Sequence, residues 1–133
     1  MTNGNKGIRY PVKITITNTS KYDYSDHETD WFYWTIIIET DPEEFLQYIK
    51  SVRYHLHPTF PQKEITISDR HTNFKLESRG WGEFIIKLDI ILKDNKKATV
   101  THYLALGGSS KEEVLETKTE RVLLEKDFTR LHF

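Results

Sequence analysis

Cysteine is absent from this chain of 133 residues. Its absence excludes disulfide bonds, thiolate zinc sites and cysteine nucleophiles. It also suits a reducing compartment, and we expect a cytoplasmic protein because the N-terminal segment lacks the apolar core of a signal peptide. No apolar run approaches the length that crosses a bilayer, so no membrane partner is expected.

An excess of charge of one sign is missing as well. Lys and Arg together number 19 and Asp and Glu number 20, which gives a net charge of −1. Binding the phosphates of nucleic acids requires a clear surplus of cations. We therefore expect no nucleic-acid partner.

The motifs of common catalytic and nucleotide-binding sites are also lacking. The segment Gly107-Gly108-Ser109 does not fit G-x-S-x-G, and no glycine-rich phosphate or dinucleotide motif is present. Thr59 and His57 could pair as nucleophile and base, but the sequence offers neither an oxyanion hole nor an orienting acid. We predict that the protein is not an enzyme and needs no cofactor.

Histidine supplies the one pattern that suggests a metal. His55 and His57 are two residues apart, so on a strand they would share a face. Either His71 or His102 could then complete an imidazole site. Because structural zinc usually recruits thiolates and none is available, we predict no metal site.

Alternating apolar and polar residues are abundant in what remains. Val12, Ile14 and Ile16 alternate with polar residues, which is the period of a half-buried strand. Aromatic residues make up 13% of the chain and supply large areas for burial. Many short strands with turn signals between them predict an all-β sandwich of about eight antiparallel strands. We expect these strands in the segments 12–17, 31–39, 52–57, 65–67, 74–76, 83–93 and 100–106.

Other segments predict loops and turns. Residues 18–30 are rich in Ser, Asp and Thr and predict a long loop. Asp41, followed by proline and two acids, predicts the cap of one short helical turn. Ser110 with Glu113 resembles a capping box, and residues 117–125 mix Thr and Val with acids. We therefore expect a short helical turn and then a strand in the tail.

The chain has no internal repeat and no linker, so one domain is expected. We divide it into a flexible N-terminal tail over residues 1–9, a β-sandwich over residues 10–108 and a C-terminal extension over residues 109–133. The extension is expected to pack on the same domain.

Two glycines flank Trp81 at the beginning of the clearest predicted strand. Glycine permits positive φ and a close approach of the backbone. Gly80 and Gly82 could thus hold the indole of Trp81 at a loop tip, open to a ligand. A tight turn whose Trp packs on its own sheet is the alternative.

Three segments, taken in order, resemble the motifs of YEATS domains. Residues 54–61, Tyr-His-Leu-His-Pro-Thr-Phe-Pro, resemble the motif F-x-L-H-x-S/T-F/Y. Residues 74–84 resemble the segment E-x-G-W-G-E-F at the expected separation, and residues 34–38 resemble the strand W-T-V-x-V. The resemblance covers residues 31–106, and its His-Pro-Thr-Phe-Pro form is more similar to the prokaryotic branch.

The resemblance implies an immunoglobulin-like β-sandwich and a ligand site. Eukaryotic members of the family read acylated lysine on histones. The family also uses an aromatic residue or a His from the loop before the W-T-V strand. The resemblance does not separate the candidates for that role, which are His27, Trp31, Phe32 and Tyr33, and we include Phe32 in the predicted set. The implied ligand-binding residues are His57, Thr59, Phe60, Gly80, Trp81, Gly82 and Phe32.

The resulting hypothesis is a non-catalytic module that binds an acylated lysine, or a similar flat acyl group, between aromatic side chains. Trp81 and Phe60 would enclose the acyl group, and Thr59 would bond its amide. The partner would be an acylated-lysine protein or peptide. The alternative is a sandwich in prokaryotic signalling or defence that binds another protein without any preference for acyl-lysine.

Overall fold

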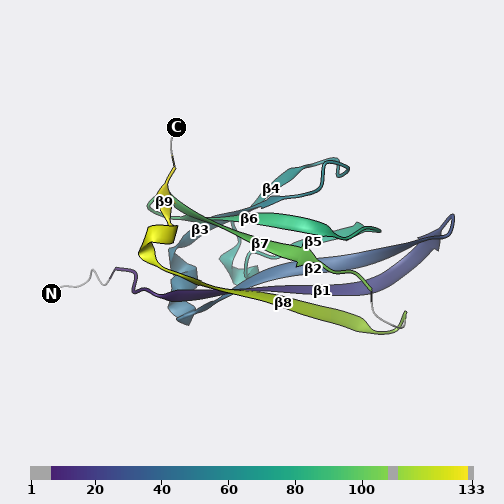
Figure 1. Ribbon diagram of the computed structural model, residues 1–133, viewed down its shortest axis with the longest axis horizontal. Helices are drawn as coiled ribbons and strands as arrows, with labels where there is room; N and C mark the ends of the chain where they lie inside the picture. Colours follow the sequence, from purple (N-terminus) through teal and green to yellow (C-terminus); the bar gives the residue numbers. More distant parts are fainter. Residues whose placement is uncertain (1–6, 108–110, 132–133) are drawn as a thin grey trace.

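The structure is a computed structural model that describes residues 7–107 and 111–131. Two antiparallel sheets pack face to face, as Figure 1 shows. The first sheet has the strand order β5-β2-β1-β8. Its strands are β1 (Val12–Asp26), β2 (Thr29–Asp41), β5 (Leu76–Gly80) and β8 (Val114–Leu123).

The second sheet has the order β4-β3-β6-β7-β9. Its strands are β3 (Ile49–His55), β4 (Glu64–Ile67), β6 (Phe84–Leu92), β7 (Lys96–Leu104) and β9 (Thr129–Arg130). Three short 3₁₀ turns occur among the described residues, namely η1 (Glu43–Tyr48), η2 (Arg70–Thr72) and η3 (Glu125–Asp127). The prediction of an antiparallel β-sandwich is confirmed, with nine described strands where about eight were expected.

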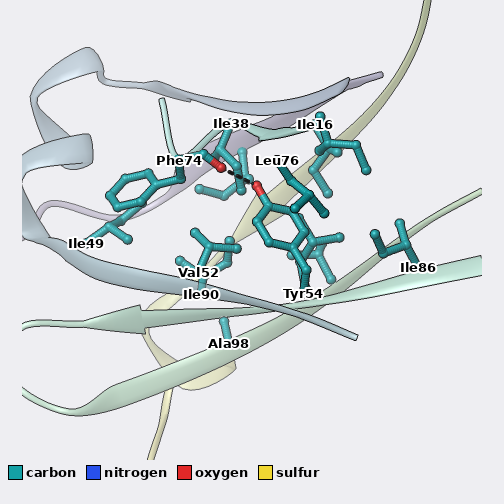
Figure 2. Packing of buried hydrophobic residues seen from close by; sticks show 14 of the residues in the cluster. Ile16, Ile38, Ile49, Val52, Tyr54, Phe74, Leu76, Ile86, Ile90 and Ala98 are labelled. Carbon is teal, nitrogen blue, oxygen red and sulfur yellow. Dashed lines mark hydrogen bonds between the residues drawn. The ribbon is translucent and has the colours of Figure 1, made fainter. Parts of the chain in front are cut away.

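The core lies between the sheets and follows the alternation seen in the sequence. Ile14 and Ile16 on β1 are fully buried, and so are the inward residues of β6. Tyr54 of β3 spans the two layers, because its hydroxyl donates to the Phe74 carbonyl over 2.5 Å (Figure 2). Burial raises the pKa of Tyr54, and this hydrogen bond satisfies its only donor.

The prediction of a long loop over residues 18–30 is wrong. These residues form the outer part of a hairpin between β1 and β2, which projects beyond the other strands in Figure 1. His27 and Glu28 make the turn with φ of 51° and 67°. Since both faces of this arm are largely solvated, its sequence lacks the alternation that marks a half-buried strand.

Two smaller expectations also change. A helical turn does follow Asp41, but its cap is Pro42 and makes no side-chain hydrogen bond. In the tail, Lys111 and Glu112 form a turn and β8 begins at Val114, so the described residues 111–113 contain no helix. Ser110, the predicted cap there, lies outside the described residues. None of the helices described is long and apolar enough to span a membrane.

Candidate functional site

A cavity of about 320 Å³ opens at one end of the sandwich. It lies between the loop 56–63, which joins β3 and β4, and the turn 81–83, which joins β5 and β6. Figure 1 shows both loops at the end from which the β1–β2 hairpin projects. The lining residues are Trp31, His57, Thr59, Phe60, Pro61, Arg79, Gly80, Trp81, Gly82, Glu83 and Phe84.

His57 organises the first of these loops. The backbone N–H of Thr59 donates to Nδ1 of His57 over 3.2 Å, so this nitrogen is an unprotonated acceptor. The Thr59 hydroxyl lies 3.0 Å from the same nitrogen and therefore donates to it. Because the hydroxyl is used as a donor, its oxygen keeps lone pairs with which to accept from a ligand.

Phe60 forms the apolar floor of the cavity. Its ring packs edge-on against Trp34 at 6.4 Å and in a tilted arrangement against Phe84 at 5.6 Å between centroids. Phe84 in turn contacts the ring of His57 at 5.9 Å. Trp34 is buried, and its Nε1 has no hydrogen-bond partner among the described residues. The floor thus joins the site to the hydrophobic core.

Trp81 stands at the mouth of the cavity and is 59% exposed. Among the described aromatic residues, none stacks on the Trp81 ring. Trp81 and Phe60 both line the cavity, and we refer to the part of the cavity that these two residues line as the slot.

Glu83 holds the turn 81–83 against the neighbouring strand. Its Oε1 accepts from the Tyr103 hydroxyl over 2.7 Å, and its Oε2 accepts from the Leu106 N–H over 2.8 Å. The first of these bonds raises the pKa of Tyr103. Both carboxylate oxygens are thus engaged on the side of the cavity that faces β7.

The β1–β2 hairpin supplies the opposite wall. Trp31 of β2 lines the cavity and stacks on Tyr24 of β1, with centroids 5.9 Å apart and planes within 2°. Arg79 of β5 also lines the cavity, and its Nε donates to Asp23 over 2.6 Å. This ion pair ties the projecting arm to the body of the first sheet.

Phe32 lies outside the cavity, although we included it in the predicted ligand-binding set. Its ring meets Tyr22 edge-on, and a methyl group at Gly107 would come within 3.0 Å of it. Successive residues of a strand point to opposite faces, so Trp31 and Phe32 cannot line the same wall. The other six predicted residues all border the cavity.

Gly80 and Gly82 do not adopt the positive φ that glycine permits. Positive φ occurs at Gly7 and Gly107 but not at Gly80 or Gly82. A methyl group at Gly80 would lie 3.5 Å from Nε1 of Trp34 and 3.6 Å from the Phe60 ring, so Gly80 backs directly onto the floor. The position next to Gly82 is open.

The histidines do not converge on a metal site. His55 bonds Asp89 on the outer face of the second sheet over 2.7 Å, and His102 is buried between the sheets with Asn18 and Thr119. Within residues 7–107 and 111–131, no group of three or more potential ligands could hold a metal ion. Nor does any carboxylate among these residues hydrogen-bond to His57, so the His57–Thr59 pair lacks the third member of a triad.

Sequence comparison identifies the class to which this sandwich belongs. The family model described as prokaryotic YEATS domain matches residues 32–105. The chain therefore belongs to the prokaryotic YEATS domain family, and the resemblance read from the motifs is confirmed.

Solved structures share this fold. The Yaf9 YEATS domain bound to H3K27ac has 26% sequence identity and a TM-score of 0.64, with 90% of each chain covered. Yaf9 described as the yeast AF-9 homolog protein has 26% identity and a TM-score of 0.60, over 82% of this chain and 77% of that one. The Yaf9 YEATS domain recognising an H3K122suc peptide has 24% identity and a TM-score of 0.59, over 87% and 91%.

Proposed function

We propose that the protein is a non-catalytic binding module that takes an acylated lysine side chain of a protein partner into the cavity. The observation that carries this proposal is the cavity itself, which is lined by Phe60, by the exposed Trp81 and by Thr59. A related YEATS domain, that of Yaf9, has been solved bound to H3K27ac, which supports a peptide as the kind of ligand.

The chemistry of the slot suits a flat, neutral amide. The rings of Phe60 and Trp81 offer apolar faces to an acyl group, and the Thr59 oxygen can accept from the amide N–H. A backbone N–H in the turn at Trp81 would donate to the acyl oxygen. With its donor and acceptor both satisfied, burying the amide costs little.

Unmodified lysine would be a poor ligand. Its ammonium would lose water on entering an apolar slot, which costs several kcal/mol unless an anion compensates. Glu83 is the one carboxylate among the described lining residues, and Tyr103 and Leu106 already occupy its oxygens.

Acyl chains longer than acetyl should bind better up to the size of the cavity. Each additional buried CH₂ adds about 0.8 kcal/mol. Flat unsaturated groups, such as crotonyl, gain further from contact with two aromatic faces. We also propose Trp31, rather than Phe32, as the third aromatic wall, because its side chain borders the cavity.

The partner we propose is a cytoplasmic protein other than a histone, since the family is described as prokaryotic. The division of the chain into tail, sandwich and C-terminal extension remains part of the proposal. Binding of a protein without any acyl preference is the competing function, and the exposed Trp81 could serve it equally.

Isothermal titration with matched peptides separates these functions. Peptides that carry lysine, acetyl-lysine, crotonyl-lysine or benzoyl-lysine at one position are titrated into the protein. We expect no measurable binding of lysine, weak binding of acetyl-lysine and tighter binding of crotonyl-lysine. Trp81→Ala should lower the crotonyl-lysine affinity by about tenfold or more.

Val122→Ala is the matched control, because Val122 is 61% exposed on β8 and lies outside the lining of the cavity. It should leave every affinity unchanged. Equal binding of all four peptides, or their uniform failure to bind, would remove the acyl-lysine proposal.

A further inference from the structure

Large apolar side chains are exposed directly beside the cavity. Ile85 of β6 is 67% exposed and Tyr103 of β7 is 55% exposed. The two residues are paired directly across the β6–β7 ladder, so their side chains stand together on the outer face of the second sheet. Trp81, which is 59% exposed, lies four residues before Ile85 at the mouth of the cavity.

This exposed pair is continuous with the cavity through Glu83. Glu83 lines the cavity and accepts from the Tyr103 hydroxyl over 2.7 Å. Ile85 follows Glu83 by two residues, which corresponds to about 7 Å along a strand. A ligand that occupies the cavity and emerges past Trp81 therefore meets Ile85 and Tyr103 next.

The exposed apolar surface on the β6–β7 ladder consists of the single cross-strand pair Ile85 and Tyr103. The next outward pair on the same ladder is Lys87 opposite Thr101, and both are exposed and polar. The inward neighbours, such as Ile86 and Leu104, are fully buried and complete the core without Ile85 or Tyr103. A cross-strand pair contributes to sheet stability, and because this pair lies beside the cavity, its exposed apolar area is available to a ligand that leaves the cavity there.

We propose that the Ile85–Tyr103 pair binds one apolar side chain of the partner peptide, at a position within two residues of the acylated lysine. The inference rests on the proposed function and adds sequence selectivity to it. An extended peptide advances about 3.3 Å per residue, so a side chain one or two positions from the lysine reaches the pair. Aliphatic side chains fit the Tyr103 ring and the Ile85 branch, whereas amide or hydroxyl groups would lose water there without a partner.

The test uses crotonyl-lysine peptides that differ at a single flanking position. Leu and its near-isostere Asn are placed in turn at each of the two positions before and after the modified lysine, with Ala elsewhere. We expect one of these positions to favour Leu over Asn by about tenfold in Kd, which corresponds to about 1.4 kcal/mol. Ile85→Thr should remove that preference.

Three further measurements distinguish selectivity for the flanking residue from binding of the acyl group in the cavity. Crotonyl-lysine with blocked ends, which has no neighbours, should bind Ile85→Thr and the unmodified protein equally. Tyr103→Phe keeps the ring and loses the bond to Glu83, so it should retain the preference for Leu. Val122→Thr replaces a methyl group with a hydroxyl on a similarly exposed side chain of β8 and should change none of these affinities.

The outcomes distinguish the two proposals. If crotonyl-lysine peptides bind and no flanking position prefers Leu, the role of Ile85 and Tyr103 is overturned while the acyl-lysine function stands. A preference for Leu that survives in Ile85→Thr overturns it as well. If no crotonyl-lysine ligand binds in any form, both proposals fall together.

Discussion

At the scale of single residues, the site depends on how Thr59 uses its hydroxyl. The N–H of Thr59 fixes Nδ1 of His57 as an acceptor, and the hydroxyl of the same residue then points its hydrogen at that nitrogen. The Thr59 oxygen is left as an acceptor at the edge of an apolar slot. An acyl-lysine amide has a donor to match it, whereas a lysine ammonium would have to lose water in an apolar slot whose one described carboxylate, that of Glu83, already accepts two hydrogen bonds.

Thr59→Val removes this acceptor with little change of shape. We expect the crotonyl-lysine affinity to fall by about tenfold, because an amide N–H buried without a partner costs about 1–3 kcal/mol. Thr59→Ser, which keeps a hydroxyl, should stay within about threefold of the original affinity on the same scale of hydrogen-bond energies. Titration calorimetry of both variants measures the effect, and equal losses in the two would contradict the assigned role.

The sequence predicts most of the individual cavity residues because they fall in short motifs. His57, Thr59 and Phe60 are contiguous in one motif, and Gly80, Trp81 and Gly82 in another. Phe32 does not border the cavity, and the motif could not show this, since it gives the position of a residue along the chain but not the face of the strand. Alternation along β2 would not have selected Trp31 either, because Phe32 shares the face of the buried Trp34 and Trp31 lies on the other face.

At the scale of elements, the β1–β2 hairpin is more than a connection between two strands. It carries Trp31 to the cavity, and the Arg79–Asp23 ion pair fixes its position relative to β5. The sequence does not reveal this arm, because a solvated two-stranded ribbon has no buried face to impose alternation. Its polar composition is typical of a loop.

Trp31→Ala and Phe32→Ala form a matched pair that tests this wall. Trp31→Ala should weaken crotonyl-lysine binding by about five- to tenfold, because the side chain borders the cavity. Phe32→Ala should instead lower the free energy of unfolding by about 1–3 kcal/mol, because it removes packing on Gly107 and Tyr22.

Urea unfolding and peptide titration of both variants measure the two effects separately. A loss of affinity in Phe32→Ala, with none in Trp31→Ala, would contradict the assignment of the wall.

At the scale of the whole molecule, the two sheets are joined by a buried polar network as well as by the apolar core. His102 of β7 lies within 2.7 Å of the Thr119 hydroxyl and within 3.2 Å of Oδ1 of Asn18. Since an amide oxygen can only accept, Nε2 carries the proton and Nδ1 accepts from Thr119. The same Asn18 oxygen accepts the N–H of Ala105, which fixes the chain beyond β7.

Burial lowers the pKa of His102. The unfolded chain therefore binds a proton at a higher pH than the folded chain does, and protonation favours unfolding. The contribution of neutral His102 to the free energy of unfolding is fully present above about pH 6.5, the ordinary pKa of histidine. It is lost as the pH falls towards the pKa of His102 in the folded protein.

The free energy of unfolding should therefore fall as the pH is lowered from 7 to 5. Urea unfolding across this range should give a flatter profile for His102→Gln. His27→Gln, at an exposed position on the hairpin turn, should keep the original profile. Identical profiles for all three proteins would contradict the role assigned to His102.

The ionisation of Asp89 should also make the free energy of unfolding fall as the pH is lowered, but in a lower pH range. Burial tends to raise the pKa of Asp89, but hydrogen bonds from His55 and Thr99 outweigh it, and the net pKa is lowered. Its contribution is therefore present above about pH 4 and is lost below the ordinary pKa of aspartate.

The architecture as a whole is predictable from the sequence because strands with one buried face impose a period of two. Burial on β7 alternates residue by residue from Ala98 to Leu104, and burial on β6 alternates over its first half. What cannot be predicted is the pairing of β8 with β1, because β8 is an exposed edge strand with little apolar alternation. Pairing between distant segments is also a tertiary effect that local patterns do not encode.

The central claim is that an acyl-lysine side chain occupies the slot between Phe60 and Trp81, and NMR tests it most directly. Crotonyl-lysine peptide is added to the ¹⁵N-labelled protein, and the backbone and indole N–H signals are followed. We predict shifts at Thr59, Gly80, Gly82 and the Trp81 indole, none at Val122, and no change with the lysine peptide. Shifts that gather elsewhere on the sandwich, or that are equal for both peptides, would contradict the account.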